Sequence, residues 1–302
     1  MFPPSAKPRG DEVTFMSVNF DFHVHLYPPE IVMDAPKIAE REPYFDALIH
    51  SGVHKWGALE DLLSRMERDE VERAVVFGFA FQDLALCRLC NDYIIDCVSR
   101  YPAKLDGMCV VPPLARGFDE EVFRCADAGL VGVGELFPEG QGIDISDISQ
   151  TWRLAGAVDE AGLCVLWHTA EPVGHKYSGK GAVGPREAAA FCTNHPEVRV
   201  VFAHLGGGLW LYELMPEMRL YLSNAMYDLA ACPWLYDARV LDMIETAGMT
   251  GKFLMGTDFP ILDSTRYEKM FLASSLQEDS KARIKSGNAA ALLASLKKRN
   301  RK

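Results

Sequence analysis

The sequence has no excess of positive charge. Its 31 lysines and arginines are outnumbered by 42 aspartates and glutamates, which gives a formal net charge of −11. Proteins that bind nucleic acid through its phosphates need clustered Lys and Arg, and the only basic run, KKRNRK at residues 297–302, is interpreted as a solvated tail. We therefore expect no nucleic-acid partner, although a small anionic substrate would need only one local cation.

Long apolar runs are also absent. No stretch approaches the ~20 apolar residues that a membrane-spanning helix requires, so no membrane insertion is expected. The first residues, MFPPSAKPRGDEVTF, are polar and rich in proline, without the apolar stretch of a secretory signal. Residues 1–17 are predicted to be a flexible arm, and Met16 is an alternative translation start to Met1.

The cysteines follow no disulfide or zinc pattern. All 8 are scattered, mostly in apolar segments, and Cys87 and Cys90 form a C-x-x-C inside a helical pattern with no matching second pair. Buried free thiols in a reducing compartment are the favoured interpretation. A cytoplasmic location is therefore expected.

From residue 18 onward, short β-rich apolar runs alternate with amphipathic stretches, which is typical of parallel strands joined by helices. Strands are predicted at residues 17–24, 72–80, 104–111, 130–136, 163–168, 198–204, 220–227 and 252–258. Helical patterns follow at residues 59–69, 84–100, 119–128, 147–162, 185–195, 211–218, 238–248 and 266–276. The pattern predicts a (β/α)8 TIM barrel over residues 18–302, with a doubly wound open sheet as the alternative.

Two connections are longer than the rest, at residues 26–57 and 169–184. Long loops at the carboxyl ends of barrel strands usually build and cover the active site. We expect both connections to contribute to a substrate pocket.

Metal-competent side chains stand at the ends of five predicted strands. In DFHVH, His23 and His25 are two residues apart, so both side chains leave the same face of a strand. The others follow apolar strands at Glu135, His168, His204 and Asp258. Carboxyl ends of barrel strands meet at one mouth, so these residues predict a divalent-metal site. Satisfied core histidines are the alternative, and His50, His54, His175 and His195 lack this placement.

This set resembles the amidohydrolase superfamily. FAHLGGG, GTDFP and GNAAALL are similar in particular to the amidohydrolase-related branch that contains aminocarboxymuconate semialdehyde decarboxylase and related hydrolases. The resemblance implies a TIM barrel of the metal-dependent hydrolase type, with His23, His25, His168 and Asp258 as metal ligands. It implies a catalytic role for His204, as a polarising or proton-transferring group, and Asp258 can also act as a general base.

Neutral imidazoles and a carboxylate suit Zn²⁺, and would also accept Mn²⁺ or Fe²⁺. One ion is favoured. Glu135 departs from the decarboxylase-like pattern, because a carboxylate on the fourth strand can bridge a second metal, as in TatD-like hydrolases. Orientation of substrate or of a ligand is the alternative role for Glu135.

Candidate substrate contacts lie mainly in the second long connection. Glu171, His175, Tyr177 and Lys180 follow His168 in a glycine-rich loop, where Lys180 is available for an anionic substrate group. Asp228, after the seventh strand, is expected to orient substrate or to bind a ligand histidine, with helix capping as the alternative. Gly206, Gly207 and Gly208 lack phosphate-loop spacing and are interpreted as close backbone packing.

The leading functional hypothesis is a metal-dependent hydrolase that uses activated water on a small amide, lactone or ester. The alternative is nonoxidative decarboxylation of a small unsaturated or aromatic carboxylic acid, at the same site. A non-catalytic metal-binding barrel and a metal-free hydrolase are further alternatives. The expected partner is a small molecule, and barrels of this type often form homodimers.

Overall fold

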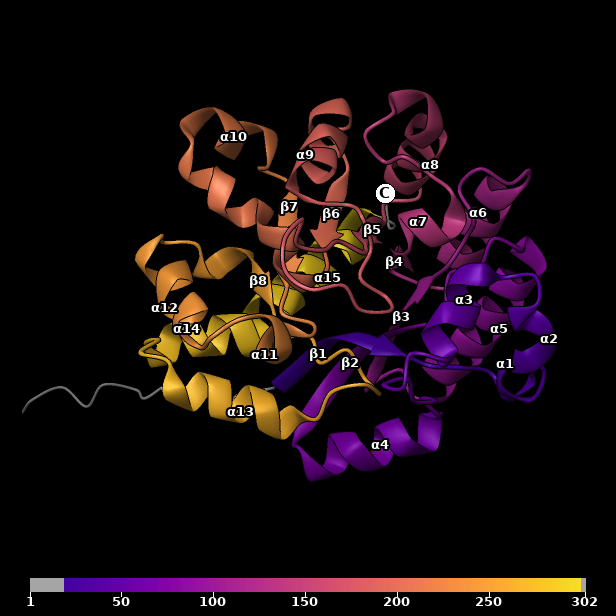
Figure 1. The fold of residues 1–302 in the computed structure, drawn as a ribbon, viewed down its shortest axis with the longest axis horizontal. Helices are drawn as coiled ribbons and strands as arrows, with labels where there is room; N and C mark the ends of the chain where they lie inside the picture. Colours follow the sequence, from indigo (N-terminus) through magenta and orange to yellow (C-terminus); the bar gives the residue numbers. More distant parts are fainter. Residues whose placement is uncertain (1–18, 300–302) are drawn as a thin grey trace, which may run out of the picture.

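The computed structural model of the chain describes residues 19–299. Eight parallel strands pair in chain order, from β1 to β8. Figure 1 shows them gathered at the centre of the molecule with helices around them. The strands are β1 Asn19–His25, β2 Val71–Phe77, β3 Leu105–Cys109, β4 Gly132–Leu136, β5 Cys164–Trp167, β6 Arg199–Phe202, β7 Ala225–Asp228 and β8 Phe253–Leu254.

The ring closes between β1 and the segment that follows β8. Val24 pairs with Phe259 in a parallel bridge, and the amide of Asp258 donates to the carbonyl of His23 at 3.0 Å. A doubly wound sheet has two free edges and a reversal in strand order, so the open-sheet alternative is wrong. The predicted (β/α)8 barrel is confirmed.

Helices connect the strands. They are α4 Leu59–Arg68, α5 Leu84–Arg100, α6 Phe118–Asp127, α7 Pro138–Gln141, α8 Ile148–Glu160, α9 Pro185–Asn194, α10 Pro216–Tyr221, α11 Cys232–Leu235, α12 Arg239–Thr246, α13 Ser264–Ala273, α14 Glu278–Ala282 and α15 Asn288–Arg299. The first long connection carries three more, α1 Pro29–Met33, α2 Ala35–Ala39 and α3 Pro43–Ile49, whereas residues 169–184 carry none. No helix of residues 19–299 is long and apolar enough to cross a membrane.

The core has two parts. A large cluster fills the layer between the strands and the outer helices. A smaller one fills the barrel interior, where Phe20, Phe22 and Phe77 meet Ala289, Leu292, Leu293 and Leu296 of α15. Helix α15 therefore packs against the interior of the barrel and contributes to its core.

The bounds of two predicted elements around β7 differ from the observed ones. The helix predicted at residues 211–218 is divided between a 3-10 segment, η1 His204–Leu214, and α10, which begins at Pro216. The strand predicted at residues 220–227 begins later, because β7 starts at Ala225. Proline has no amide hydrogen and its fixed φ suits the first helical position, so Pro216 ends one segment and starts the next.

The cysteines and one histidine are buried. All eight cysteines are free and buried, as the sequence indicated. His195 ends α9 as expected, but it is only 5% exposed, with Nε2 2.8 Å from Oγ1 of Thr151. The position of His195 before Pro196 predicts a surface residue at a helix end, and the burial shows that this prediction is wrong. The predicted arm, residues 1–17, and the Met16 start lie outside the described residues.

Candidate metal centre

The candidate metal-binding side chains lie together at the carboxyl ends of the strands. They form two groups of three, in each of which one ligand atom per residue lies within 4.8 Å of the others. One group comprises His23, His25 and Asp258, and the other comprises Glu135, His168 and His204. All six predicted residues are thus brought to one place, and all are buried.

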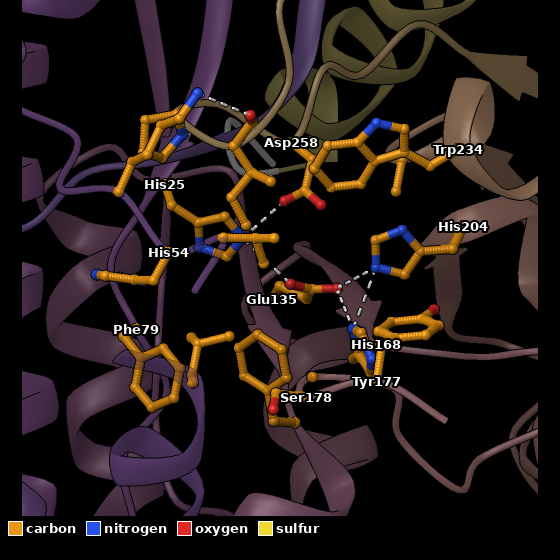
Figure 2. Close-up of a pocket in the computed structure, with 18 of the residues that line it drawn as sticks. His25, His54, Phe79, Glu135, His168, Tyr177, Ser178, His204, Trp234 and Asp258 are labelled. Atoms are coloured by element: carbon orange, nitrogen blue, oxygen red, sulfur yellow. Dashed lines mark hydrogen bonds and ion pairs between the residues drawn. The ribbon is translucent and has the colours of Figure 1, made fainter. Parts of the chain in front are cut away.

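Glu135 belongs to the second group and also reaches the first (Figure 2). Its Oε2 is 3.4 Å from Nε2 of His23 and 3.3 Å from Nε2 of His25. Its Oε1 is 3.0 Å from Nδ1 of His168 and 3.5 Å from Nε2 of His204. One carboxylate therefore presents one oxygen to each group.

Register shifts turn the ligands inward. Phe20 and Phe22 of β1 face the barrel interior, so strict alternation would turn His23 and His25 outward. The β1–β2 register shifts between Asp21 and Val24, and such an irregularity reverses which face a side chain takes.

Strand β4 behaves in the same way. Its register with β5 shifts between Val133 and Leu136, around Gly134 and Glu135. Gly134 has φ +142°, and a Cβ there would lie 2.4 Å from the carbonyl oxygen of Leu166. Only glycine fits this close approach, and the adjacent Glu135 points into the barrel mouth as a result.

Hydrogen bonds fix the orientation of three imidazoles. Nδ1 of His23 is 2.8 Å from Oδ2 of Asp228, and Nδ1 of His204 is 2.9 Å from the carbonyl oxygen of Ala230. A carbonyl only accepts, so Nδ1 of His204 carries a proton, and Nε2 is the ring nitrogen that faces Glu135. Nε2 of His168 lies 3.4 Å from the amide nitrogen of Gly181, and its Nδ1 faces Oε1 of Glu135 at 3.0 Å.

Asp21 aligns the first and last strands beneath the site. Its carboxylate accepts from the amide and hydroxyl of Thr257 at 2.8 and 2.5 Å, and from the amide of His23 at 3.2 Å. Thr257 precedes Asp258, so one buried carboxylate sets the positions of ligand candidates on both strands.

The cluster favours positive charge. Burial acts to raise the pKa of Glu135, but the imidazoles of His23 and His168 outweigh it and hold that pKa well below its usual range. Burial acts to lower the pKa of His204, and the hydrogen bond and charge of Glu135 raise it to about 9. The pKa of His23 is raised by Asp228 and Glu135 against the effect of burial. A divalent cation fits this field and this set of nitrogen and carboxylate oxygen donors.

Two functional candidates have a strained backbone. His204 has φ +55° and Asp258 has φ +61°, in the left-handed region that residues other than glycine seldom adopt. His204 opens a left-handed run that continues through Gly208, and a Cβ on Gly207 would lie 2.4 Å from the carbonyl oxygen of Ala170. The three glycines thus allow close backbone packing, as expected, beside the site.

A cavity of about 100 Å³, open to solvent, lies over the metal-competent cluster. Glu135, His168, His204, His25 and Asp258 line it, and aromatic walls come from Tyr27, Phe79, Phe137, Tyr177 and Trp234. Both long connections contribute, as expected, and they meet where the hydroxyl of Tyr44 donates to the carbonyl of Gly179 at 3.2 Å. The mostly apolar lining suits a small organic molecule.

Only one of the predicted substrate contacts lines this cavity. Tyr177 does, whereas Glu171, His175, Lys180 and Asp228 do not. Nζ of Lys180 donates to the carbonyls of Val173 and His175 within its own loop, and Glu171 lies beside Tyr236. Asp228 is fully buried beneath His23, and its Oδ1 accepts from the amides of His204 and Ala230.

Sequence reasoning missed two polar residues of the pocket wall. His54 and Lys55 both line the cavity, and His54 had been set aside because it follows no strand. Burial, followed by the charge of His25, lowers the pKa of His54 to about 4, so its ring is neutral near pH 7. Their place at the end of the first long connection was the only signal in the sequence.

The fold and site define a TIM-barrel enzyme with a metal-competent centre at the carboxyl end of its strands. The chain belongs to the amidohydrolase family, whose model, described as Amidohydrolase, matches residues 20–294. The resemblance stated from the motifs is thereby confirmed. No curated protein matches the sequence.

Solved structures share the fold at low identity. 5-Carboxyvanillate decarboxylase from Sphingomonas paucimobilis is 15% identical, with a TM-score of 0.68 over 91% of this chain and 98% of that chain. A dihydroxybenzoic acid decarboxylase from Polaromonas sp. JS666, solved with manganese and 2-nitroresorcinol, is 16% identical, with a TM-score of 0.66 and coverage of 91% and 96%. A probable 2-pyrone-4,6-dicarboxylic acid hydrolase from Acinetobacter baumannii is 14% identical, with a TM-score of 0.60 and coverage of 92% and 99%.

Proposed function

We propose that the protein is a metal-dependent hydrolase that binds two divalent ions and acts on a small amide, lactone or ester. The observation that carries the proposal is the position of Glu135, which offers one carboxylate oxygen to each group of ligand candidates. His23, His25 and Asp258 would hold one ion, His168 and His204 the other, and Glu135 would bridge them. The single-ion expectation, by contrast, placed His168 with the first group.

The ions would supply Lewis acidity, lowering the pKa of a water molecule towards ~7 and stabilising negative charge that develops on the substrate carbonyl. The chain supplies the geometry. Oδ1 of Asp258 lies 3.7 Å from Nε2 of His23 and 3.6 Å from Nε2 of His25, at the cavity surface. It is positioned to accept a proton from the attacking water and to return it to the leaving group.

Zinc is the proposed metal, because four imidazoles and two carboxylates suit it, and manganese and iron are also compatible. We propose the cytosol as the compartment, since all eight cysteines are free and buried. The homodimer expected from the resemblance stays a prediction.

Nonoxidative decarboxylation is the second candidate. Two of the similar structures are named as decarboxylases of aromatic acids, and five aromatic side chains wall the cavity here. This reaction requires one ion to hold the substrate while a proton replaces carbon dioxide, and His204 would then act on the substrate rather than as a ligand. The position of Glu135 favours hydrolysis.

Elemental analysis after metal-replete expression tests the proposal. We expect two ions per chain in the wild type, and fewer than one in Glu135→Gln, because both groups lose a shared ligand. His204→Asn should retain one ion. His50→Gln, at an exposed histidine outside the cavity, is the matched control and should keep two.

Turnover of a panel of lactones, amides and aromatic carboxylates completes the test. Hydrolysis that chelation abolishes and added zinc restores supports the proposal. One ion per chain together with release of carbon dioxide would replace it with the decarboxylase. Stoichiometric metal without turnover of any panel member would favour the non-catalytic barrel.

A further inference from the structure

The cavity wall carries one permanent cation. Lys55 is the only Lys or Arg among the described residues that line the cavity. Its Nζ donates to the carbonyl oxygen of Ile261 at 3.2 Å, and it pairs with no carboxylate of residues 19–299. This bond holds the ammonium group against the segment that follows β8, and leaves two of its three hydrogens for other partners.

His54, the neighbouring residue, offers an unused polar atom. Its Nε2 is buried and has no hydrogen-bond partner, although the residue lines the cavity. The ring is held by edge contacts with Trp56 and Tyr27, at centroid distances of 4.4 and 5.6 Å. A buried nitrogen without a partner costs free energy that a ligand can recover.

We propose that His54 and Lys55 bind a carboxylate group of the substrate, remote from the bond that reacts. The proposal rests on the proposed function for the identification of this cavity as the active site. The ammonium group of Lys55, with two free hydrogens, and the unpartnered ring nitrogen of His54 offer polar contacts for the two oxygens of a carboxylate. The rest of the substrate would be flat and apolar, because Phe79, Phe137 and Trp234 form the adjoining walls.

This assignment moves anion recognition from the second long connection to the first. Lys180, the cation expected from the sequence, is satisfied by two carbonyls of its own loop. Lys55 has the cavity position that Lys180 lacks. The substrate class that follows is a planar acid with a hydrolysable bond at one end and a carboxylate at the other.

Calorimetric titration of the metal-loaded protein tests this without knowledge of the true substrate. The probes are benzoate and the three benzenedicarboxylates, in which the second carboxylate stands at different distances from the first. We expect at least one dicarboxylate to bind about tenfold more tightly than benzoate, as for one added charge-assisted hydrogen bond. Lys55→Met should abolish that preference, so that benzoate and the dicarboxylates bind with similar affinity.

Two further variants test the contribution of His54 and the effect of a charge outside the cavity. His54→Phe keeps an aromatic ring against Trp56 but removes Nε2, and should lose part of the preference. Lys176→Met removes an exposed charge of the second connection that does not line the cavity, and should lose none. The preference should shrink between about 0.05 M and about 0.5 M NaCl, because Lys55 is solvent-exposed and salt screens its charge.

Equal affinity of benzoate and all three dicarboxylates for the wild type would overturn the proposal. So would equal losses in Lys55→Met and Lys176→Met. Binding is measured without turnover, so a preference that depends on Lys55 in a protein that hydrolyses nothing would support this site and count against the hydrolase. Hydrolysis without any such preference would do the reverse.

Discussion

Asp228 and His23, which are 205 residues apart in sequence, meet at 2.8 Å, and neither is exposed to solvent. The contact joins the carboxylate on β7 to Nδ1 of the imidazole on β1, and leaves Nε2 directed at Glu135, Asp258 and His25. Partners of this kind fix the tautomer of a metal-binding histidine and raise its basicity.

Asp228→Asn should therefore weaken metal binding without removing a ligand. The side-chain amide of Asn either donates its N–H to His23 or accepts more weakly than a carboxylate. In both cases the tautomer of His23 that carries its proton on Nδ1 is favoured less. We expect a loss of about tenfold to hundredfold in metal affinity. Competition with a chromophoric chelator measures it. Asp237→Asn, at an exposed aspartate, should leave the affinity unchanged; an unchanged affinity in Asp228→Asn would contradict the positioning role.

Gly134→Ala should destabilise the barrel and disturb Glu135. The new Cβ would lie 2.4 Å from the carbonyl oxygen of Leu166 and 2.7 Å from its Cβ, at a φ that L-residues avoid. We expect a loss of ~2 kcal/mol or more in the free energy of unfolding. Urea unfolding checks this. Gly156→Ala in α8, where a Cβ meets nothing within 4 Å, should instead gain roughly 0.5–1 kcal/mol.

Lys252→Met should lower the free energy of unfolding. Glu213 is 3% exposed and accepts from Nζ of Lys252 at 2.7 and 2.6 Å and from the hydroxyl of Tyr227 at 2.7 Å. Removal of the ammonium leaves the charge of Glu213 without its counterion, at an expected cost of about 3 kcal/mol. Adding Glu213→Gln should recover part of the loss.

The matched control for that pair is Lys37→Met. Lys37 and Asp34 form an exposed ion pair, which contributes little because water screens it. We expect a change in unfolding free energy within about 0.5 kcal/mol. Equal losses of unfolding free energy in Lys252→Met and Lys37→Met would show that the buried pair contributes no more to stability than the exposed pair.

His195 should make stability depend on pH. Burial lowers the pKa of His195 below its ordinary 6.5, with Glu197 opposing more weakly. As the pH falls through 6.5, the unfolded chain takes up a proton here that the folded chain does not, so the free energy of unfolding falls. His195→Gln should flatten this part of the profile.

Urea midpoints between about pH 7.5 and about pH 5.5 measure the effect, across the range in which a free histidine titrates. The difference between wild type and variant isolates His195 from the other histidines. His50→Gln, at an exposed position, should follow the wild-type slope. A His195→Gln profile parallel to the wild type would show that burial does not shift this group.

The barrel was predictable because alternation of strand and helix is a local pattern. All eight predicted strands overlap the observed ones, but that at residues 252–258 only over Phe253–Leu254 and the seventh only over Ala225–Tyr227. The error there came from an apolar run, LYL, that the chain uses in α10 and in the turn after it. Local hydrophobicity does not tell a short strand from a helix end, and Pro216 was the available correction.

The sequence was enough to predict which residues form the site, but not how they are arranged in space. Strand-end position was enough to gather the four histidines with Glu135 and Asp258. Their division into two groups depends on register shifts in β1 and β4, which have no clear sequence signature apart from Gly134. His54 and Lys55 lie in a connection with no periodicity, so only the three-dimensional path of that loop brings them to the cavity.

The packing of α15 against the barrel interior bears on how the chain is made. Phe20, Phe22 and Phe77 leave the ribosome well before the leucines that complete their cluster, Leu292, Leu293 and Leu296. During synthesis the nascent barrel therefore has an uncovered apolar interior until α15 has emerged. Such surface is what chaperones bind and what aggregates, so premature termination before α15 should yield an insoluble product rather than a shorter enzyme.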